Sequence, residues 1–319
     1  MSIDRQLLTQ LRRYEDARAG ISEEFMERRL GPRSALALLS SPLGERRFPG
    51  WVICPSIGPE HGNLRRLETL LARGLAAAGF PVLRIRPDVD PAFGVFGEID
   101  LSIRLQEVEE AVEALRAESG AHAVGLLGVL FGGTVAALVC DRQRLPAMAL
   151  IEPVGRGRQY LREAMRRHAV AELMAAAEAA VEEPDESLAQ RPMRELSTVG
   201  HTTIRGLRLA QEEFERISAV NLVDDLRSFR GRSLLVGISP TGGVSPGLRK
   251  LRERLDALEG DVTLDLIEDS LPAPLGDYYY RNEGAVRVDT RLELDLKLAD
   301  AIAAWALDGA VAPSRAEVA

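Results

Sequence analysis

The stretch with the clearest chemical signature is residues 128–133, which read Gly-Val-Leu-Phe-Gly-Gly. Small residues at its first, fifth and sixth positions let a strand and the following helix approach closely, which is the spacing of a nucleophile elbow. At the third position, where such a turn presents a nucleophile for acyl transfer, the chain has Leu130. A leucine has no lone pair and no labile proton, so the pattern predicts the architecture of acyl-transfer catalysis without its nucleophile.

Four polar side chains are further candidates for catalytic chemistry. Ser56 lies in a loop rich in Pro and Gly, His61 lies just beyond that loop, and His201 lies in a later helical region. Glu152 ends the strand expected after the turn, at a sheet edge where ligands bind. Each also has a structural interpretation, because loop serines mostly bond their own backbone, lone histidines are mostly solvated, and Glu-Pro is an ordinary turn.

Composition limits what this chain can be. Its 319 residues are 46% hydrophobic and 28% charged with a formal net charge of −8, which is typical of a globular protein and unfavourable for nucleic acid. No apolar run approaches the roughly 18 residues of a membrane span. The charged N-terminus shows no secretory signal, so a cytoplasmic location is expected. Cys54, Cys140 and four scattered histidines predict no disulfide, no metal site and no cofactor.

Alternating strands and helices must position these residues. Short apolar runs predict strands, and apolar residues at helical spacing predict helices. The expected strands are 51–54, 81–85, the run before Gly128, and 148–151; the expected helices are 64–75 with Asn63 as N-cap, 100–118, and the segment after the turn. This alternation predicts a parallel sheet covered on both faces, the doubly wound α/β class. Segments 23–29 and 34–40, joined by a Gly-Pro turn, predict an antiparallel hairpin at its edge.

The second half of the chain interrupts this alternation and then resumes it. Helical segments between residues 155 and 230 predict a cap inserted over the carboxyl edge of the sheet. Strands follow at 233–238 and 262–267, and then a helix at about 289–307. That helix is expected to turn five side chains toward the core: Leu292, Leu296, Leu298, Ile302 and Trp305. The predicted organisation is an extension at 1–21, a core at 22–154 and 231–308, a helical cap at 155–230 and a disordered tail at 309–319.

This order of elements resembles the α/β-hydrolase fold over roughly residues 22–308. The segments CPSIGPEHGNLRR, LAAAGFPVLRI and EPVGRGRQYLREAMRR are also similar to bacterial hydrolase-like proteins, among them those associated with exosortase and natural-product gene clusters. The resemblance implies a mostly parallel sheet with an antiparallel N-terminal hairpin and an inserted helical cap.

The resemblance also implies which three positions would hold a catalytic triad, and the sequence gives the residue at each of them. Leu130 holds the nucleophile position. The acid position after 233–238 reads Ser-Pro-Thr-Gly-Gly, and the region 268–287, where a histidine base belongs, contains no histidine. The nucleophile, the acid and the base are thus all absent from their expected positions. This argues against Ser-His-Asp chemistry, because that mechanism depends on the nucleophile–base pair.

The backbone amides of an oxyanion hole can be retained in a protein that has lost the catalytic triad. The resemblance implies that the amide of Phe131 and an amide at Ile57 or Gly58 are its donors, able to hold a carbonyl or polar group. The simpler alternative is a helix start buried under the cap. Tyr278 and Tyr279 occupy the loop of the absent histidine, where they either line a ligand pocket or pin the loop onto the core.

Three hypotheses follow. The first is a non-hydrolytic protein that binds a small acyl-type ligand or a partner protein beneath the cap. The second is an active hydrolase, cyclase or lyase that uses Glu152, His61 or His201 for acid–base work in the same pocket. The third, a nucleotide-binding turn, is weaker, because glycines at 125, 128, 132 and 133 do not meet the GxGxxG spacing. A homodimer stays open.

Overall fold

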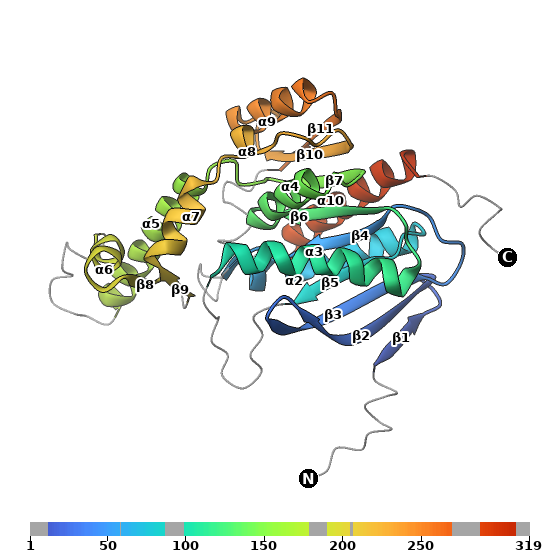
Figure 1. Ribbon diagram of the computed structural model, residues 1–319, viewed down its shortest axis with the longest axis horizontal. Coiled ribbons are helices and arrows are strands. Elements are labelled where there is room, and N and C mark those ends of the chain that lie inside the picture. The colour runs from blue at the N-terminus through green and yellow to red at the C-terminus, as the bar shows by residue number, and fades with distance from the viewer. Residues whose placement is uncertain are drawn as a thin grey trace, which may run out of the picture.

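A mixed nine-stranded sheet forms the centre of the molecule in a computed structural model, which describes residues 12–57, 59–86, 99–178, 190–204, 207–269 and 288–310. Its strand order is β1-β2-β3-β5-β4-β6-β7-β10-β11 (Figure 1). The strands are β1 Arg13–Asp16, β2 Ile21–Leu30, β3 Arg33–Pro42, β4 Gly50–Cys54, β5 Val82–Arg86, β6 Val124–Val129, β7 Ala147–Ile151, β10 Arg232–Ser239 and β11 Asp261–Glu268. From β5 to β11 neighbouring strands are parallel, whereas β1, β2 and β3 are antiparallel to their neighbours.

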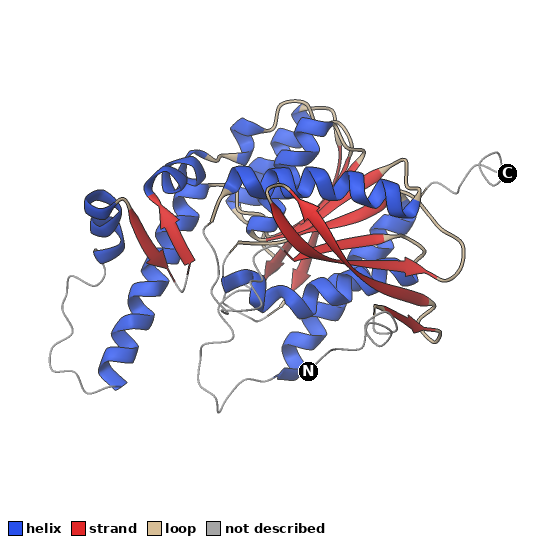
Figure 2. Ribbon diagram, turned by 60° about the horizontal axis from the view of Figure 1, so that its bottom comes forward, coloured by secondary structure: helices blue, strands red, loops and turns tan. Residues whose placement is uncertain are grey.

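Helices cover both faces of this sheet, as the turned view shows (Figure 2). The core helices are α2 Pro59–Ala77, α3 Leu101–Ser119, α4 Phe131–Gln143, α9 Pro246–Ala257 and α10 Val288–Asp308. Side chains of α3, α4 and α9 pack with one face, and side chains of α2 and α10 pack with the other. The predicted doubly wound class and the edge hairpin are confirmed. None of the helices within the described ranges is long and apolar enough to cross a membrane.

Two predicted details are wrong. The first crossover helix begins at Pro59 and not after Asn63, because proline suits the first turn of a helix, where its missing N–H is not needed. In α10, Leu292 and Leu296 are 39% and 44% exposed, whereas Leu294 is 1% exposed. The buried side of α10 therefore follows Leu294 and Leu298, one turn apart, against α2.

The described parts of residues 155–230, called the insertion below, contain strands as well as helices, and most of them lie to one side of the sheet (Figure 1). Its elements are α5 Gly157–Glu178, α6 Arg191–Val199, β8 His201–Ile204, β9 Leu207–Ala210, α7 Gln211–Ala219 and α8 Leu222–Asp225. The antiparallel pair β8–β9 was not expected from the sequence. Glu213 joins the insertion to the core, since its Oε1 accepts a hydrogen bond of 2.7 Å from the Leu101 amide.

Candidate functional site

The turn between β6 and α4 has the backbone of a nucleophile elbow. Leu130 has φ 52° and ψ −122°, a strained conformation for a side-chain-bearing residue. The close approach of β6 and α4 at this turn requires glycine at position 128, because a Cβ there would lie 2.2 Å from the Gly132 carbonyl oxygen. A hydrogen bond of 3.0 Å from the Leu130 amide to the Ile151 carbonyl oxygen stabilises the turn. The predicted strand, tight turn and helix are confirmed.

The loop after β4 packs directly against this turn. A Cβ on Gly132 would lie 2.4 Å from the last carbonyl oxygen of β4 and 3.1 Å from the Ser56 amide nitrogen. Helix α4 begins at Phe131, whose amide has no carbonyl four residues back inside the helix. Phe131 and Ile57 are 0% and 3% exposed and belong to one buried cluster, so these two predicted ligand-binding residues lie in the same region. Gly58 lies outside the described residues.

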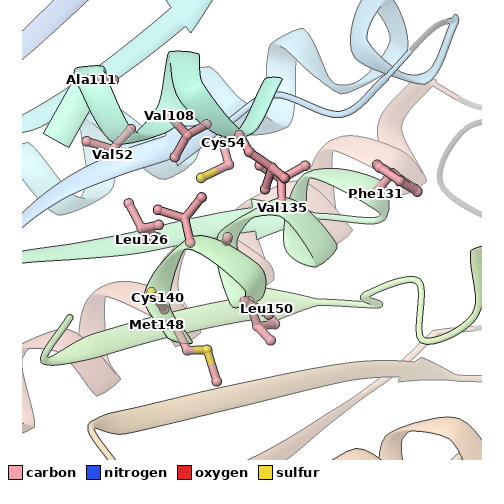
Figure 3. Packing of buried hydrophobic residues seen from close by; sticks show 14 of the residues in the cluster. Val52, Cys54, Val108, Ala111, Leu126, Phe131, Val135, Cys140, Met148 and Leu150 are labelled. Atoms are coloured by element: carbon pink, nitrogen blue, oxygen red, sulfur yellow. The ribbon is translucent and has the colours of Figure 1, made fainter. Parts of the chain in front are cut away.

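The Leu130 side chain is part of the core. It is 8% exposed and belongs to the apolar cluster between the sheet and helices α2 and α10, together with Ile151 and Val236. Phe131, the next residue, belongs to the cluster on the opposite face, where Figure 3 shows it at the start of α4. The aliphatic side chain of Leu130 therefore occupies the position in which an elbow nucleophile would present its oxygen or sulfur.

The two cysteines are packing residues. Figure 3 shows Cys54 and Cys140 inside the apolar layer formed by α3, α4 and the strands beneath them. Both are free and buried, and burial raises the pKa of each thiol well above its usual range. A thiol held in its neutral form is a poor nucleophile.

A buried polar cluster lies beside the elbow and consists of Ser56, Glu60, Tyr160 and Arg167. Ser56 Oγ donates a hydrogen bond of 3.0 Å to Glu60 Oε2, and Arg167 Nη2 lies 3.8 Å from Glu60 Oε1. Tyr160 is also hydrogen-bonded to Glu60, and burial together with the charge of Glu60 raises the pKa of the phenol well above its usual range. The ring of Tyr160 lies 5.2 Å from that of Phe131, which connects the cluster to the start of α4.

Sequence reasoning named Ser56 but missed its partners. One local signal was available, since Glu60 opens α2 four residues after Ser56. A second was the spacing of Tyr160 and Arg167, seven residues apart and therefore on one side of α5. The pairing of these two segments, about a hundred residues apart, is visible only once the insertion is placed.

Three members of the cluster line a cavity of about 40 Å³ between the core and the insertion. Besides Glu60, Tyr160 and Arg167, its walls are Ile57, Ile99, Leu161, Ala164, Ile204 and Leu207. This volume suits a few water molecules. A larger ligand therefore requires α5 and the β8–β9 hairpin to shift away from the core.

The Glu60–Arg167 pair is expected to couple measurably, because both side chains are largely buried, at 12% and 15% exposure. Glu60→Gln and Arg167→Met should each lower the free energy of unfolding by about 1–3 kcal/mol, and the double variant should lose less than their sum by more than about 0.5 kcal/mol. Urea denaturation of the four proteins measures this cycle. The exposed pair Arg166–Glu163 is the control, with an expected coupling below about 0.5 kcal/mol. Equal coupling in both cycles would contradict the buried cluster.

Glu152 lies at the carboxyl end of β7, close to the elbow. Its φ is 45°, and its Oε1 accepts a hydrogen bond of 2.6 Å from the Ile238 amide at the end of β10. Burial raises the pKa of this carboxyl, and the Ile238 hydrogen bond opposes the rise. The carboxyl group of Glu152 is thus a structural link between the ends of two neighbouring strands, with a pKa above its usual range.

The other predicted site residues are not brought together with the elbow. His201 begins β8 opposite Ala210, at the far end of the hairpin from Ile204 and Leu207, the two that line the cavity. His61 belongs to α2, but its side chain is not among those described, and Tyr278 and Tyr279 lie outside the described residues. Within the described ranges, no three His, Cys, Asp or Glu side chains gather to hold a metal ion.

Sheet order, edge hairpin, elbow and the site of the insertion together define an α/β-hydrolase fold, and solved structures agree. Est1E from Butyrivibrio proteoclasticus with bound ferulic acid matches with a TM-score of 0.59 at 14% identity, over 89% of this chain and 98% of that one. The esterase domain of a Rhodothermus marinus protein matches with a TM-score of 0.55 at 18% identity, over 90% and 98%. Brefeldin A esterase, described as a bacterial homologue of human hormone-sensitive lipase, matches with a TM-score of 0.53 at 15% identity, over 91% and 77%.

The chain therefore has the α/β-hydrolase fold. No protein-family model and no curated protein sequence matches it. At these identities the structural likeness establishes the fold alone, and the site itself must carry any argument about activity.

Proposed function

We propose that this chain is a non-hydrolytic protein that binds a small acyl-type ligand beneath its insertion, in the cavity between the insertion and the core. The observation that carries the proposal is Leu130, which has the backbone conformation of an elbow nucleophile and a side chain that cannot attack. The acid position supports it, because Ser239 ends β10 and its Oγ accepts hydrogen bonds from the Thr241 and Gly243 amides. The base position falls in 268–287, where the sequence has no histidine.

The cavity supports an acyl-type ligand over a strongly polar one. Most of its wall is aliphatic, which suits a short hydrocarbon chain. Phe131 lies behind Tyr160 and not in the cavity wall, and its amide at the start of α4 suits a carbonyl oxygen once the insertion shifts, because a helix N-terminus favours partial negative charge. Glu60 and Tyr160 add polar groups at the cavity wall that can fix the orientation of a ligand.

The pure protein should not hydrolyse p-nitrophenyl acetate, p-nitrophenyl butyrate or a thioester above the rate in buffer, because the elbow offers no nucleophile. A fluorophosphonate probe should leave it unlabelled for the same reason. Colorimetric assay and intact-mass spectrometry measure these two results. Turnover that persists in Leu130→Ala would overturn the non-hydrolytic part of the proposal.

The binding part has its own readout. Hexanoate, titrated calorimetrically, should bind the wild type, and Ala164→Phe should abolish binding by filling the cavity. Ala219→Phe, at an exposed position of α7, is the matched control and should bind as the wild type does. Equal binding by both variants would place the ligand elsewhere.

A second candidate is acid–base catalysis by Glu152, with His61 and His201 as the other sequence candidates. The observation in its favour is the left-handed backbone of Glu152 together with its raised pKa, since strained residues and shifted carboxyls occur often at active sites. Any turnover found in the ester screen should then fall in Glu152→Gln. Turnover that is unchanged in Glu152→Gln, His61→Gln and His201→Gln would exclude this candidate.

A further inference from the structure

A second cleft lies away from the elbow, between α2 and the strands β2, β3 and β5, which are neighbours in Figure 1. It has a volume of about 120 Å³, three times that of the cavity under the insertion. Its walls bring together the side chains of Arg65, Arg84 and Arg86, the carboxyl group of Glu68, and the apolar side chains of Phe25 and Leu36. Three guanidinium groups and an apolar wall therefore meet in one hollow.

The arginines come from two elements whose geometry aims them at the same space. Arg84 and Arg86 are two residues apart in β5 and so lie on one face of the strand. Arg65 lies on α2, one turn before Thr69, whose Oγ1 accepts a hydrogen bond of 2.7 Å from Arg84 Nη1. Burial lowers the pKa of Arg86, and the positive charge of Arg65 lowers it further, whereas the nearby carboxyl of Glu68 raises it.

Glu68 is the lining carboxylate that faces these three arginines, and two buried guanidinium donors beside it have no acceptor among the described residues. The Nε atoms of Arg84 and Arg86 are buried without a hydrogen-bond acceptor among them. Glu23 is 4.0 Å from Arg84 but is engaged by Arg73 Nε at 3.0 Å and by Ser40 Oγ at 3.2 Å. Buried donors of this kind are normally satisfied by protein or by water, and an oxyanion in the cleft is another acceptor able to satisfy them.

We propose that this cleft binds a phosphate or sulfate monoester, with the anionic head on Arg65, Arg84 and Arg86 and the organic group against Phe25, Leu36 and Leu38. Planar guanidinium forks suit tetrahedral oxyanions, which accept several N–H donors at once. Phe25 and Leu36 are 41% and 40% exposed, so the apolar wall reaches the surface and can cover an alkyl or aryl substituent. This site is independent of the function proposed for the elbow.

Glu68 makes the binding pH-dependent. The groups that face it are Arg65 on its own helix, Arg84 and Arg86 on β5, and Cys54 on β4, which stays neutral. Burial raises the pKa of Glu68 to about 7, against which the three arginines act. Above that pH an ionised Glu68 repels the anion, and below it a protonated Glu68 leaves the arginine charge uncompensated. Affinity should therefore fall as the pH rises from 6 to 8.

Calorimetric titration with sulfate at constant ionic strength tests the head-group site, since sulfate does not titrate in this range. Arg86→Gln and Arg65→Gln should each weaken sulfate binding by about tenfold, the effect of one charge-assisted hydrogen bond. Arg249→Gln, an exposed arginine of α9, is the control and should bind as the wild type does. Glu68→Gln should remove the pH dependence. Equal binding by wild type, Arg86→Gln and Arg65→Gln would overturn the site.

Two further ligands test the organic group. Phenyl phosphate should bind at least about threefold more tightly than inorganic phosphate, because the ring gains apolar contact, and Leu36→Ser should remove that advantage. Equal affinity for the two would overturn the assignment to an ester. Circular dichroism of each variant verifies folding, and the exposed side chain of Arg65 keeps the test valid if Arg86→Gln does not fold.

Discussion

Gly128→Ala should lower the free energy of unfolding by about 3 kcal/mol or more. The added methyl group would lie 2.2 Å from the carbonyl oxygen of Gly132 and 2.5 Å from the amide nitrogen of Gly133. Both contacts are with backbone, so no side chain can rotate away, and β6 and α4 must move apart. That movement would release the Leu130 conformation and disturb the apolar layers on both faces of the sheet. Equilibrium denaturation in urea measures the loss.

Gly155→Ala is the matched control for this substitution. Gly155 lies in the connection between β7 and α5, its φ is not in the left-handed region, and no atom lies within 4 Å of the position of an added Cβ. Its replacement should change stability by no more than about 0.5 kcal/mol. A Gly128→Ala protein as stable as Gly155→Ala would contradict the close packing of strand and helix at the elbow.

Local pattern predicted most of the core, because each strand and helix there has a strong period and a clear stop. The hairpin β8–β9 escaped prediction for the opposite reason: each strand has four residues, too few to show alternation beside long helices. The error in α10 is of another kind. Its sequence LELDLKL repeats leucine every second residue, so the pattern cannot tell Leu292 and Leu296 from Leu294 and Leu298, and packing against α2 decides.

The elbow was predictable because its glycines are local, but the surroundings of the elbow were not. Glu60 and Tyr160 meet only when the insertion folds back over the loop after β4. Arg84 and Arg86 gave a fainter signal, since two arginines alternating inside an otherwise apolar strand must share a face. The position of β5 in the sheet decides which of its faces packs against α2 and Arg65. The residues of β5 alone do not decide it.

The second large effect is expected at Asp141, near the end of α4. This carboxylate is 8% exposed, and its Oδ1 accepts hydrogen bonds from the amides of Arg227, Ser228 and Phe229 at 2.9, 2.7 and 2.7 Å. Those three residues carry the chain from the insertion back into β10, and Phe229 is 0% exposed. One side chain thus anchors the return of the insertion to the core.

Asp141→Ala should therefore lower the free energy of unfolding by about 3–5 kcal/mol, since it leaves several backbone donors without an acceptor. Asp141→Asn keeps an oxygen for these amides and should lose only about 1–2 kcal/mol. Asp256→Ala, at an exposed carboxylate of α9 that is 3.6 Å from Arg252, should stay within about 0.5 kcal/mol of the wild type. Hydrogen exchange should also show earlier opening of the Phe229 amide in Asp141→Ala. If Asp141→Ala were as stable as Asp256→Ala, the return segment would be held by its apolar contacts and not by this carboxylate.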